Sequence, residues 1–316
     1  MRLASLAIVT GLGLGLAASP AMALTIDFAQ ISGDTLTTQQ ADAFDVAAEA
    51  WEAVLTNPVT ITVDIGFTSP SNLGGSGTDA LSSATPEEYY TGYPSLKTTL
   101  VDTATSAAQI SSAQNLPSSV VNNNVVATAA DWLALGYSVS SQAGKIQFSN
   151  TVNFQYSRNA DGSVSCGYYD FIGIAEHEIG HILGFISDVD TNTNFETVLD
   201  LDRYTAAGTP TFTYAAPGPT SYFSVNGGVT DVADFATGDP NQASHWLALA
   251  EPGALMQPTI GAGATQNITA IDLEAMNVIG WDLTVPEPGS VALLGTALAG
   301  LLAMRRRAVR PAPTRA

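Results

Sequence analysis

Residues 170–184 read DFIGIAEHEIGHILG and contain the pattern HEIGH, formed by His177, Glu178 and His181. On a helix, residues four apart lie on the same face, so the two imidazoles point the same way. At about 100° per residue, the apolar side chains of this stretch fall on the opposite face. They are Ile172, Ala175, Ile179, Ile182, Leu183 and Ile186. The stretch therefore predicts an amphipathic helix that buries its apolar face and turns its histidines toward a cleft.

The same pattern carries the residue types of a catalytic zinc site. Two imidazoles one helical turn apart can bind one zinc ion, with Glu178 beside them as general base for a water on the metal. A catalytic zinc has three protein ligands and keeps a further position open. The chain holds three histidines, so one remains: His245, in the tripeptide SHW. Asp188 and Asp190 are the competing third ligands, and we expect His245.

Three segments together resemble the metzincin zinc proteases: HEIGHILGF at 177–185, SHW at 244–246 and ALMQP at 254–258. The long interval before the last histidine is similar to the leishmanolysin-like branch of that group. The close-spaced form of the pattern would place its third ligand at Ser187, and serine is a poor zinc ligand.

This resemblance implies a role for five residues. His177, His181 and His245 would bind one zinc ion, and Glu178 would be the general base. Met256 would lie in the tight turn beneath the metal. No tyrosine follows Met256 in that turn, so we expect no additional tyrosine ligand there.

The resemblance also implies a fold. We expect an α+β, metzincin-like catalytic domain over residues 24–284. A mixed sheet and the active-site helix would belong to an N-terminal subdomain, about 24–186. A loop-rich C-terminal subdomain, 187–284, would close the other side of a cleft. An extended peptide would add to an edge strand near residues 146–150.

Both ends of the chain resemble export signals. Residues 1–23 combine Arg2, an apolar run and the small residues of a cleavage site, which predicts a signal peptide. Residues 285–310 run from VPEPGS through an apolar segment into three consecutive arginines. This order resembles the PEP-CTERM sorting signal of Gram-negative bacteria. It implies processing by an exosortase-type enzyme and a location at the cell surface or in the extracellular matrix. The alternative is a C-terminal transmembrane helix that stays as an anchor, for which the apolar run is short.

The span between the two signals is strongly acidic. Of 29 acidic residues only Glu287 lies outside it, and of ten basic residues only Lys97, Lys145, Arg158 and Arg203 lie inside. Its formal net charge is therefore about −24. Such a surface repels nucleic acid and anionic lipid, so we expect neither as a partner. The sole cysteine, Cys166, excludes an internal disulfide, and we expect a monomer.

Hydrophobic periodicity predicts the remaining elements. Strands are expected at 24–29, 59–67 and within 146–156, and helices at 38–55, 127–135 and 268–280, the last capped by Thr269 with Asp272. Residues 68–124 are rich in Ser, Thr, Gly and Asn, which favours a long loop with one or two short helices. The acidic stretch 188–202 is expected to be a solvated loop, with a calcium site as the alternative. Residues 206–243 are expected to form a long loop or several short strands.

These observations lead to one functional hypothesis and one rival. The hypothesis is a secreted zinc-dependent endopeptidase that acts on protein or peptide substrates. The rival is a non-enzymatic module of the cell surface or biofilm matrix that keeps a metalloprotease fold. An intact Glu178 favours the enzyme, because a purely structural zinc site would not require a general base.

Overall fold

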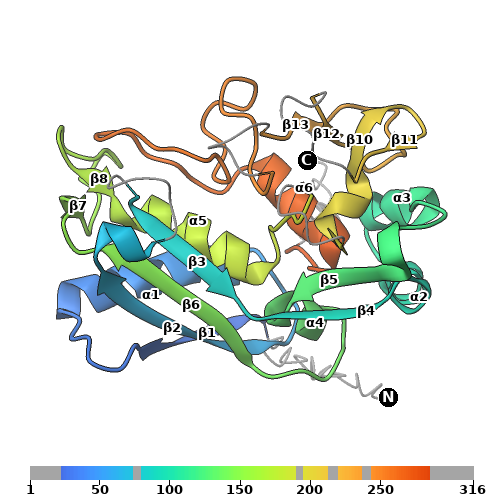
Figure 1. The fold of residues 1–316 in the computed structure, drawn as a ribbon. Helices are drawn as coiled ribbons and strands as arrows, with labels where there is room; N and C mark the ends of the chain where they lie inside the picture. Colours follow the sequence, from blue (N-terminus) through green and yellow to red (C-terminus); the bar gives the residue numbers. More distant parts are fainter. Residues whose placement is uncertain (1–22, 74–79, 190–194, 213–219, 237–242, 285–316) are drawn as a thin grey trace, which may run out of the picture.

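The computed structural model describes residues 23–73, 80–189, 195–212, 220–236 and 243–284. Within these ranges the chain has a mixed α+β fold with several small sheets (Figure 1). The expected signal peptide, the sorting signal and Asp190 lie outside the described residues, apart from residue 23. In the part of the chain that is described, no helix is both long and apolar enough to span a bilayer.

The largest sheet in the N-terminal half has the order β1-β2-β6-β3. Its strands are β1 (Thr25–Gln30), β2 (Thr60–Thr68), β6 (Gln142–Ser149) and β3 (Ser82–Pro86). The first three are parallel, and β3 runs antiparallel to β6. Two helices, α1 (Thr38–Glu52) and α5 (Phe171–Leu183), pack against each other beside this sheet (Figure 1). The predicted helices at 38–55 and 170–184 and the predicted strand at 59–67 are thereby confirmed.

Local sequence explains why these elements form. In β2 every second residue is apolar and buried, namely Ile61, Val63 and Ile65. Helix α1 begins at a capping box, in which the Thr37 hydroxyl and the Gln40 side chain exchange hydrogen bonds with backbone N–H groups. Helix α5 is buried along almost its whole length, as expected for a central helix.

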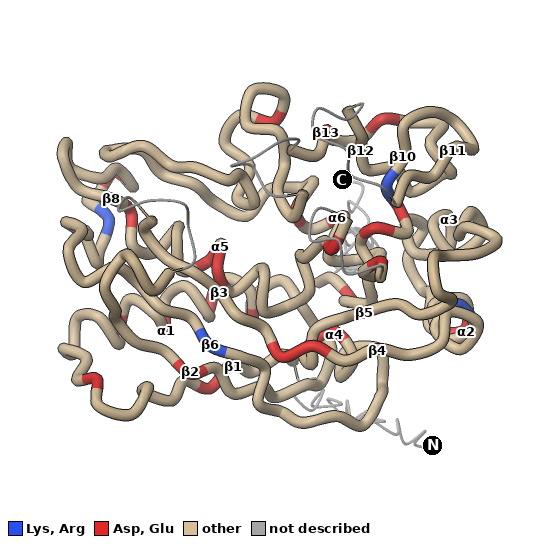
Figure 2. Tube along the Cα trace, in the orientation of Figure 1, with Lys and Arg blue, Asp and Glu red and all other residues tan. Residues whose placement is uncertain are grey.

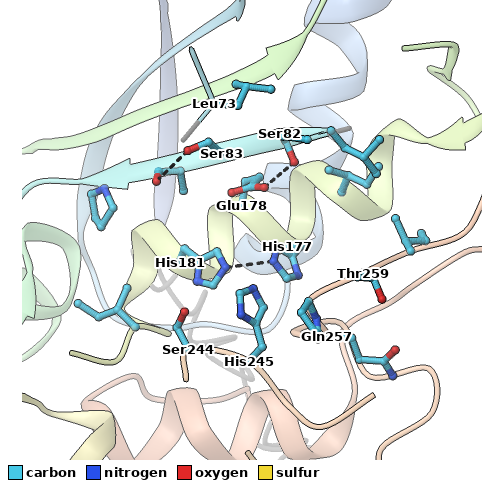
Figure 3. Close-up of a pocket in the computed structure, with 18 of the residues that line it drawn as sticks. Leu73, Ser82, Ser83, His177, Glu178, His181, Ser244, His245, Gln257 and Thr259 are labelled. Atoms are coloured by element: carbon cyan, nitrogen blue, oxygen red, sulfur yellow. Dashed lines mark hydrogen bonds between the residues drawn. The ribbon is translucent and has the colours of Figure 1, made fainter. Parts of the chain in front are cut away.

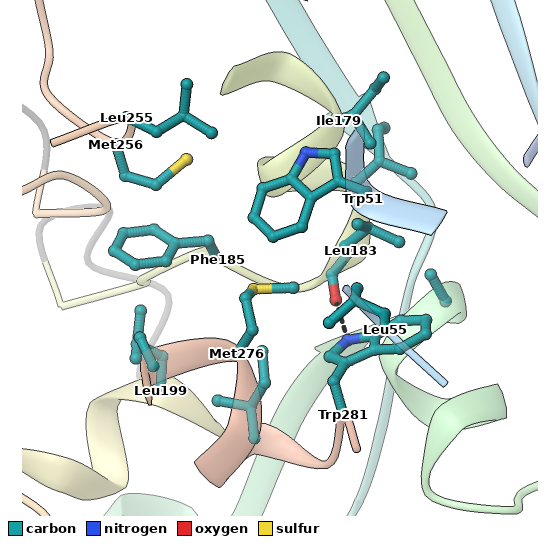
Figure 4. Packing of buried hydrophobic residues seen from close by; sticks show 14 of the residues in the cluster. Trp51, Leu55, Ile179, Leu183, Phe185, Leu199, Leu255, Met256, Met276 and Trp281 are labelled. Atoms are coloured by element: carbon teal, nitrogen blue, oxygen red, sulfur yellow. Dashed lines mark hydrogen bonds between the residues drawn. The ribbon is translucent and has the colours of Figure 1, made fainter. Parts of the chain in front are cut away.

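A continuous core joins the two halves of the chain. Trp51 of α1 and Leu183 of α5 lie close to Met276 and Trp281 from the C-terminal end (Figure 4). The Trp281 indole N–H donates to the Leu183 carbonyl at 2.8 Å, so this buried polar atom is satisfied. The C-terminal part of the chain thus packs directly against the C-terminal end of α5.

The prediction of a long loop with one or two short helices at 68–124 was right for two helices and wrong in missing two strands. This segment contains the strands β3 and β4 (Glu88–Gly92), the helices α2 (Tyr93–Thr103) and α3 (Ala107–Asn115), and two 3-10 turns, η1 (Pro70–Asn72) and η2 (Val121–Asn123). The strands are half-exposed and polar, and pairing with β6 and β5 (Asn124–Thr128) holds them in place. A hydrophobic alternation would not reveal strands whose stability comes from backbone pairing.

The expected edge strand is also corrected. Residues 146–150 belong largely to β6, which lies inside the sheet between β2 and β3. Both of its edges are therefore paired. Among the described residues, β3 forms the free edge on this side of the sheet, and β3 packs against α5.

The remaining elements are short. Strand β9 (Glu196–Thr197) completes the sheet β4-β5-β9, beside helix α4 (Ala129–Ala134), and β7 (Phe154–Gln155) pairs with β8 (Tyr169–Asp170). A further sheet has the order β11-β10-β12-β13. It contains β10 (Arg203–Ala206), β11 (Thr209–Pro210), β12 (Tyr222–Phe223) and β13 (Ala233–Asp234). The last helix, α6 (Ala270–Ile279), starts at the predicted Thr269–Asp272 capping box.

The acidic stretch 188–202 is not a solvated loop where the structure describes it. Glu196, Asp200 and Asp202 are all buried, and the last two lie in the 3-10 helix η3 (Leu199–Asp202). Asp200 forms an ion pair with Arg203 at 3.1 Å, and both side chains are buried. Burial of a charge requires such a partner, and the sequence alone did not show that Arg203 would supply it.

Candidate metal centre and its cleft

The three histidines converge at one point. His177 and His181 project from one face of α5, and His245 reaches them from the loop that precedes Trp246 (Figure 3). Each offers a ring nitrogen, and these nitrogens lie within 4.8 Å of one another. Within the described ranges this is the sole group of three or more His, Cys, Asp or Glu side chains gathered closely enough to hold a metal ion. The competitor Asp188 lines the same cleft but does not belong to that group.

Hydrogen bonds determine which ring nitrogen of each helical histidine faces the centre. His177 Nδ1 lies 2.8 Å from the Leu255 carbonyl, and His181 Nδ1 lies 2.7 Å from the Phe185 carbonyl. A carbonyl only accepts, so each Nδ1 carries a proton and donates it. In the neutral imidazoles both Nε2 atoms then carry lone pairs. Metal-binding histidines use this arrangement, in which the remote nitrogen is held by a carbonyl.

The two Nε2 atoms lie 3.0 Å apart. Two lone pairs at that distance repel each other unless a cation lies between or beside them. A proton is a poor candidate at neutral pH, because burial and the neighbouring His177 together lower the pKa of His181 to about 3. A third imidazole faces the same point. The donor set is therefore one that could hold a zinc ion with three nitrogen ligands and a further open position.

Met256 packs against α5 at Gly180, between the two histidines of the helix. It is fully buried, and a Cβ added at Gly180 would lie 2.7 Å from its sulfur atom. Gly180 stands between the two histidines along α5, so only a residue without a side chain lets the Met256 turn approach there. Met256 was predicted to lie in a turn beneath the metal; in the structure it packs against the turn of α5 that carries both histidines.

One carboxylate connects this turn to two of the histidines. Asp272, at the start of α6, accepts hydrogen bonds from the backbone N–H groups of Leu255 and Met256 and from the Trp246 indole at 2.8–3.2 Å. Leu255 supplies the carbonyl that holds His177, and Trp246 follows His245 directly in the chain. The helix cap therefore also orients two ligand-bearing segments.

Glu178 projects from the same turn of α5 toward strand β3 (Figure 3). Its Oε1 accepts the Ser82 hydroxyl proton at 2.5 Å, and its carboxylate accepts the Ala84 backbone N–H. Burial raises the pKa of the Glu178 carboxyl above its ordinary value of 4.5, while the nearby His177 and the two hydrogen bonds from β3 act in the opposite direction. A carboxylate with a raised pKa in a cleft is suited to proton transfer.

A cleft of about 570 Å³ gives access to these groups. One wall is β3 with α5, and the other comes from segments 186–188, 244–245 and 257–260 and from Gln266. The cleft thus lies between the two halves of the chain, as expected. Glu88 and Asp188 line it, and none of its described lining residues is a lysine or an arginine. Its volume is in the range of sites that bind small molecules or short peptide segments.

Sequence reasoning missed three contributors to this region. Ser82 lies in the polar stretch 80–86, which carries no pattern of its own. Asp272 was identified as a helix cap, but its contact with the Met256 turn depends on tertiary packing. Arg203 is one of only four Lys or Arg residues in the acidic span. An arginine so rare here, three residues after Asp200, was the signal in the sequence that the two side chains form a pair. The Arg203 guanidinium holds the Ala243 carbonyl at 2.7 Å, two residues before His245.

Comparison with known proteins bears on the end of the chain. Residues 284–307 match the family model of the PEP-CTERM protein-sorting motif. This motif marks the protein for export in a Gram-negative bacterium and for C-terminal processing by an exosortase-type enzyme, with anchoring at the cell surface or matrix. Neither the curated proteins nor the solved structures contain a match to this chain.

Proposed function

We propose that this chain is a secreted zinc-dependent endopeptidase with a metzincin-type site. One observation carries the proposal. The Nε2 atoms of His177 and His181 lie 3.0 Å apart, each on a ring whose Nδ1 faces a backbone carbonyl, with a third imidazole and a buried carboxylate beside them in an accessible cleft. A structural zinc site is normally closed by four protein ligands, whereas three ligands with an open position are typical of catalysis.

Each residue has a distinct part in the proposed reaction. His177, His181 and His245 hold the ion through ring nitrogens. Zinc, when bound, supplies a Lewis acid that polarises the scissile carbonyl and lowers the pKa of a water molecule. Glu178 accepts the proton of the attacking water and later donates it to the leaving amine.

The free edge of β3 offers a place for the substrate. An extended peptide can add to an exposed strand through main-chain hydrogen bonds. β3 lines the cleft beside Glu178, so a peptide paired with it would pass the three histidines. The substrate class that follows is an unfolded or extended protein segment.

The test is the substitution Glu178→Gln in the exported protein. We expect zinc content to stay at one ion per chain and hydrolysis of casein to fall by about a hundredfold or more, because the substitution removes the general base. Glu176→Gln is the matched control, since Glu176 lies on the same helix but does not line the cleft. A chelator should abolish wild-type cleavage, and added zinc should restore it.

A different result would favour the rival function. The sorting motif holds the protein at the cell surface, where a non-enzymatic matrix module would also act. If Glu178→Gln cleaves casein as fast as the wild type, or if the zinc-loaded wild type cleaves nothing in a peptide library, the endopeptidase proposal is rejected.

A further inference from the structure

Ser82 makes a direct contact with the proposed general base. It lies at the start of β3, and its hydroxyl donates to Glu178 Oε1 at 2.5 Å (Figure 3). The next residue, Ser83, donates instead to the Ala84 carbonyl at 3.5 Å. Only one of the two adjacent serines therefore acts on Glu178.

The physical role of this contact follows from the rotational freedom of the glutamate carboxylate. The last torsion of a glutamate side chain is broad and roughly twofold, so packing alone orients the two oxygens poorly. A hydrogen bond from a hydroxyl to a carboxylate is short and about twice as strong as a neutral one. The Ser82 bond, with the second bond from the Ala84 N–H, holds Glu178 in one orientation relative to the histidines.

We propose that Ser82 is a positioning residue for Glu178. The inference rests on the proposed endopeptidase function and extends it to a residue of the edge strand. Ser82 contacts Glu178, the proposed base, which is not one of the three histidines that could hold the ion, so the proposed effect is on the orientation of the base and not on retention of the ion. One strand then serves two purposes, because β3 offers its free edge to the peptide and its Ser82 hydroxyl to the base.

The experiment compares Ser82→Ala and Ser82→Thr in the zinc-loaded full chain, with a fluorogenic peptide as substrate. Loss of one hydrogen bond to a charged group predicts a fall in kcat of about tenfold or more for Ser82→Ala. KM should change less than about twofold, since Ser82 would act on the base and not on ground-state binding. Ser82→Thr keeps a hydroxyl and suits a strand, so it should recover most of the lost kcat. Zinc affinity, measured by competition with a chelating dye, should match the wild type in both variants.

Ser112→Ala is the matched control, because Ser112 also donates to a carboxylate, Asp202 Oδ2, at 2.7 Å but lies outside the cleft. It should lower the melting temperature and leave kcat unchanged. The inference is overturned if Ser82→Ala keeps wild-type kcat while Glu178→Gln is inactive, or if Ser82→Ala loses zinc, or if Thr fails to restore kcat. Failure of the endopeptidase proposal is distinguished because the wild type itself would then cleave no peptide.

Discussion

At the scale of single residues, the site depends on which ring nitrogen of each helical histidine carries the proton. The carbonyls of Leu255 and Phe185 accept hydrogen bonds from the Nδ1–H groups of His177 and His181 and so direct both Nε2 atoms to one point. Neither carbonyl belongs to a residue with site chemistry of its own. The backbone therefore decides the tautomers on which ion binding would depend.

The third ligand gives a residue-scale prediction. His245→Ala should lower zinc affinity on the order of a hundredfold or more, because an imidazole nitrogen is removed from a three-nitrogen set. Asp188→Ala should leave zinc affinity near the wild-type value, since Asp188 lies outside the cluster. Dye competition on both purified variants measures this difference.

The opposite ranking would return Asp188 to the position of third ligand. Equal losses in both variants would show that the ion is shared between imidazole and carboxylate, against the three-histidine site proposed above.

At the scale of elements, the close approach of α5 to the Met256 turn builds the site. Gly180 allows this approach, because a Cβ there would meet the Met256 sulfur at 2.7 Å and Trp51 at 3.3 Å. Asp272 draws the same turn toward the start of α6. Helix α5, the Met256 turn and α6 therefore pack as one unit, so that a shift of one displaces the others, although about 80 residues separate the first two in sequence.

Gly180→Ala tests this unit. Alanine is a better helix former than glycine, yet overpacking should make the variant less stable by about 1–3 kcal/mol. Displacement of the turn should also move the Leu255 carbonyl that holds His177, so zinc affinity should fall. Urea unfolding of the metal-free protein and zinc titration measure the two effects.

Gly261→Ala is the control, since nothing lies within 4 Å of a Cβ at Gly261. It should leave both quantities unchanged. An increase in stability for Gly180→Ala would mean that the Met256 turn can move away from α5 without a loss of stability. The claim that α5, the turn and α6 pack as one unit would then be wrong.

At the scale of the whole molecule, negative charge dominates. Acidic residues are distributed along the described chain, and basic residues occur at few places (Figure 2). Some acids are buried as well. Burial raises the pKa of Asp202 to about 7, although its hydrogen bond from Ser112 acts in the opposite direction. A high net negative charge keeps a protein soluble but destabilises its compact state through self-repulsion.

These facts predict that stability falls as pH rises. Asp202 has an ordinary unfolded pKa near 4, so between about pH 4 and 7 the folded state holds a proton that the unfolded state has lost. The stabilisation is complete below about pH 4 and is lost as pH rises through about 7, at about 1.4 kcal/mol per unit of pKa difference. Asp202→Asn should reduce this fall, measured by urea unfolding at pH 5 and pH 8.

Asp161→Asn is the control, because Asp161 is exposed and its pKa is lowered by the Ser163 hydroxyl. Asp161→Asn should leave the difference in unfolding free energy between pH 5 and pH 8 the same as in the wild type. A wild-type protein that is more stable at pH 8 than at pH 5 would contradict the assignment of a buried proton to Asp202.

Some of the helices and strands could be predicted from the sequence, and others could not. The helices at 38–52, 171–183 and 270–279 and the strand at 60–68 were predictable because each carries a strong period or a capping pair. The strands β3 and β4 were missed because polar edge strands have no such period. The burial of Asp200 was missed because its partner Arg203 acts through tertiary contacts.

By itself, the sequence determined the residue types of the candidate metal site, the spacing of two of them on one helical face and the sorting motif, since these depend on local order along the chain. Only the tertiary structure decided that His245 meets the helical pair and that β3, not β6, is the free edge beside Glu178. The physical reason is that long-range packing brings these groups together. Local periodicity carries no information about which distant segment will fill the space beside a helix.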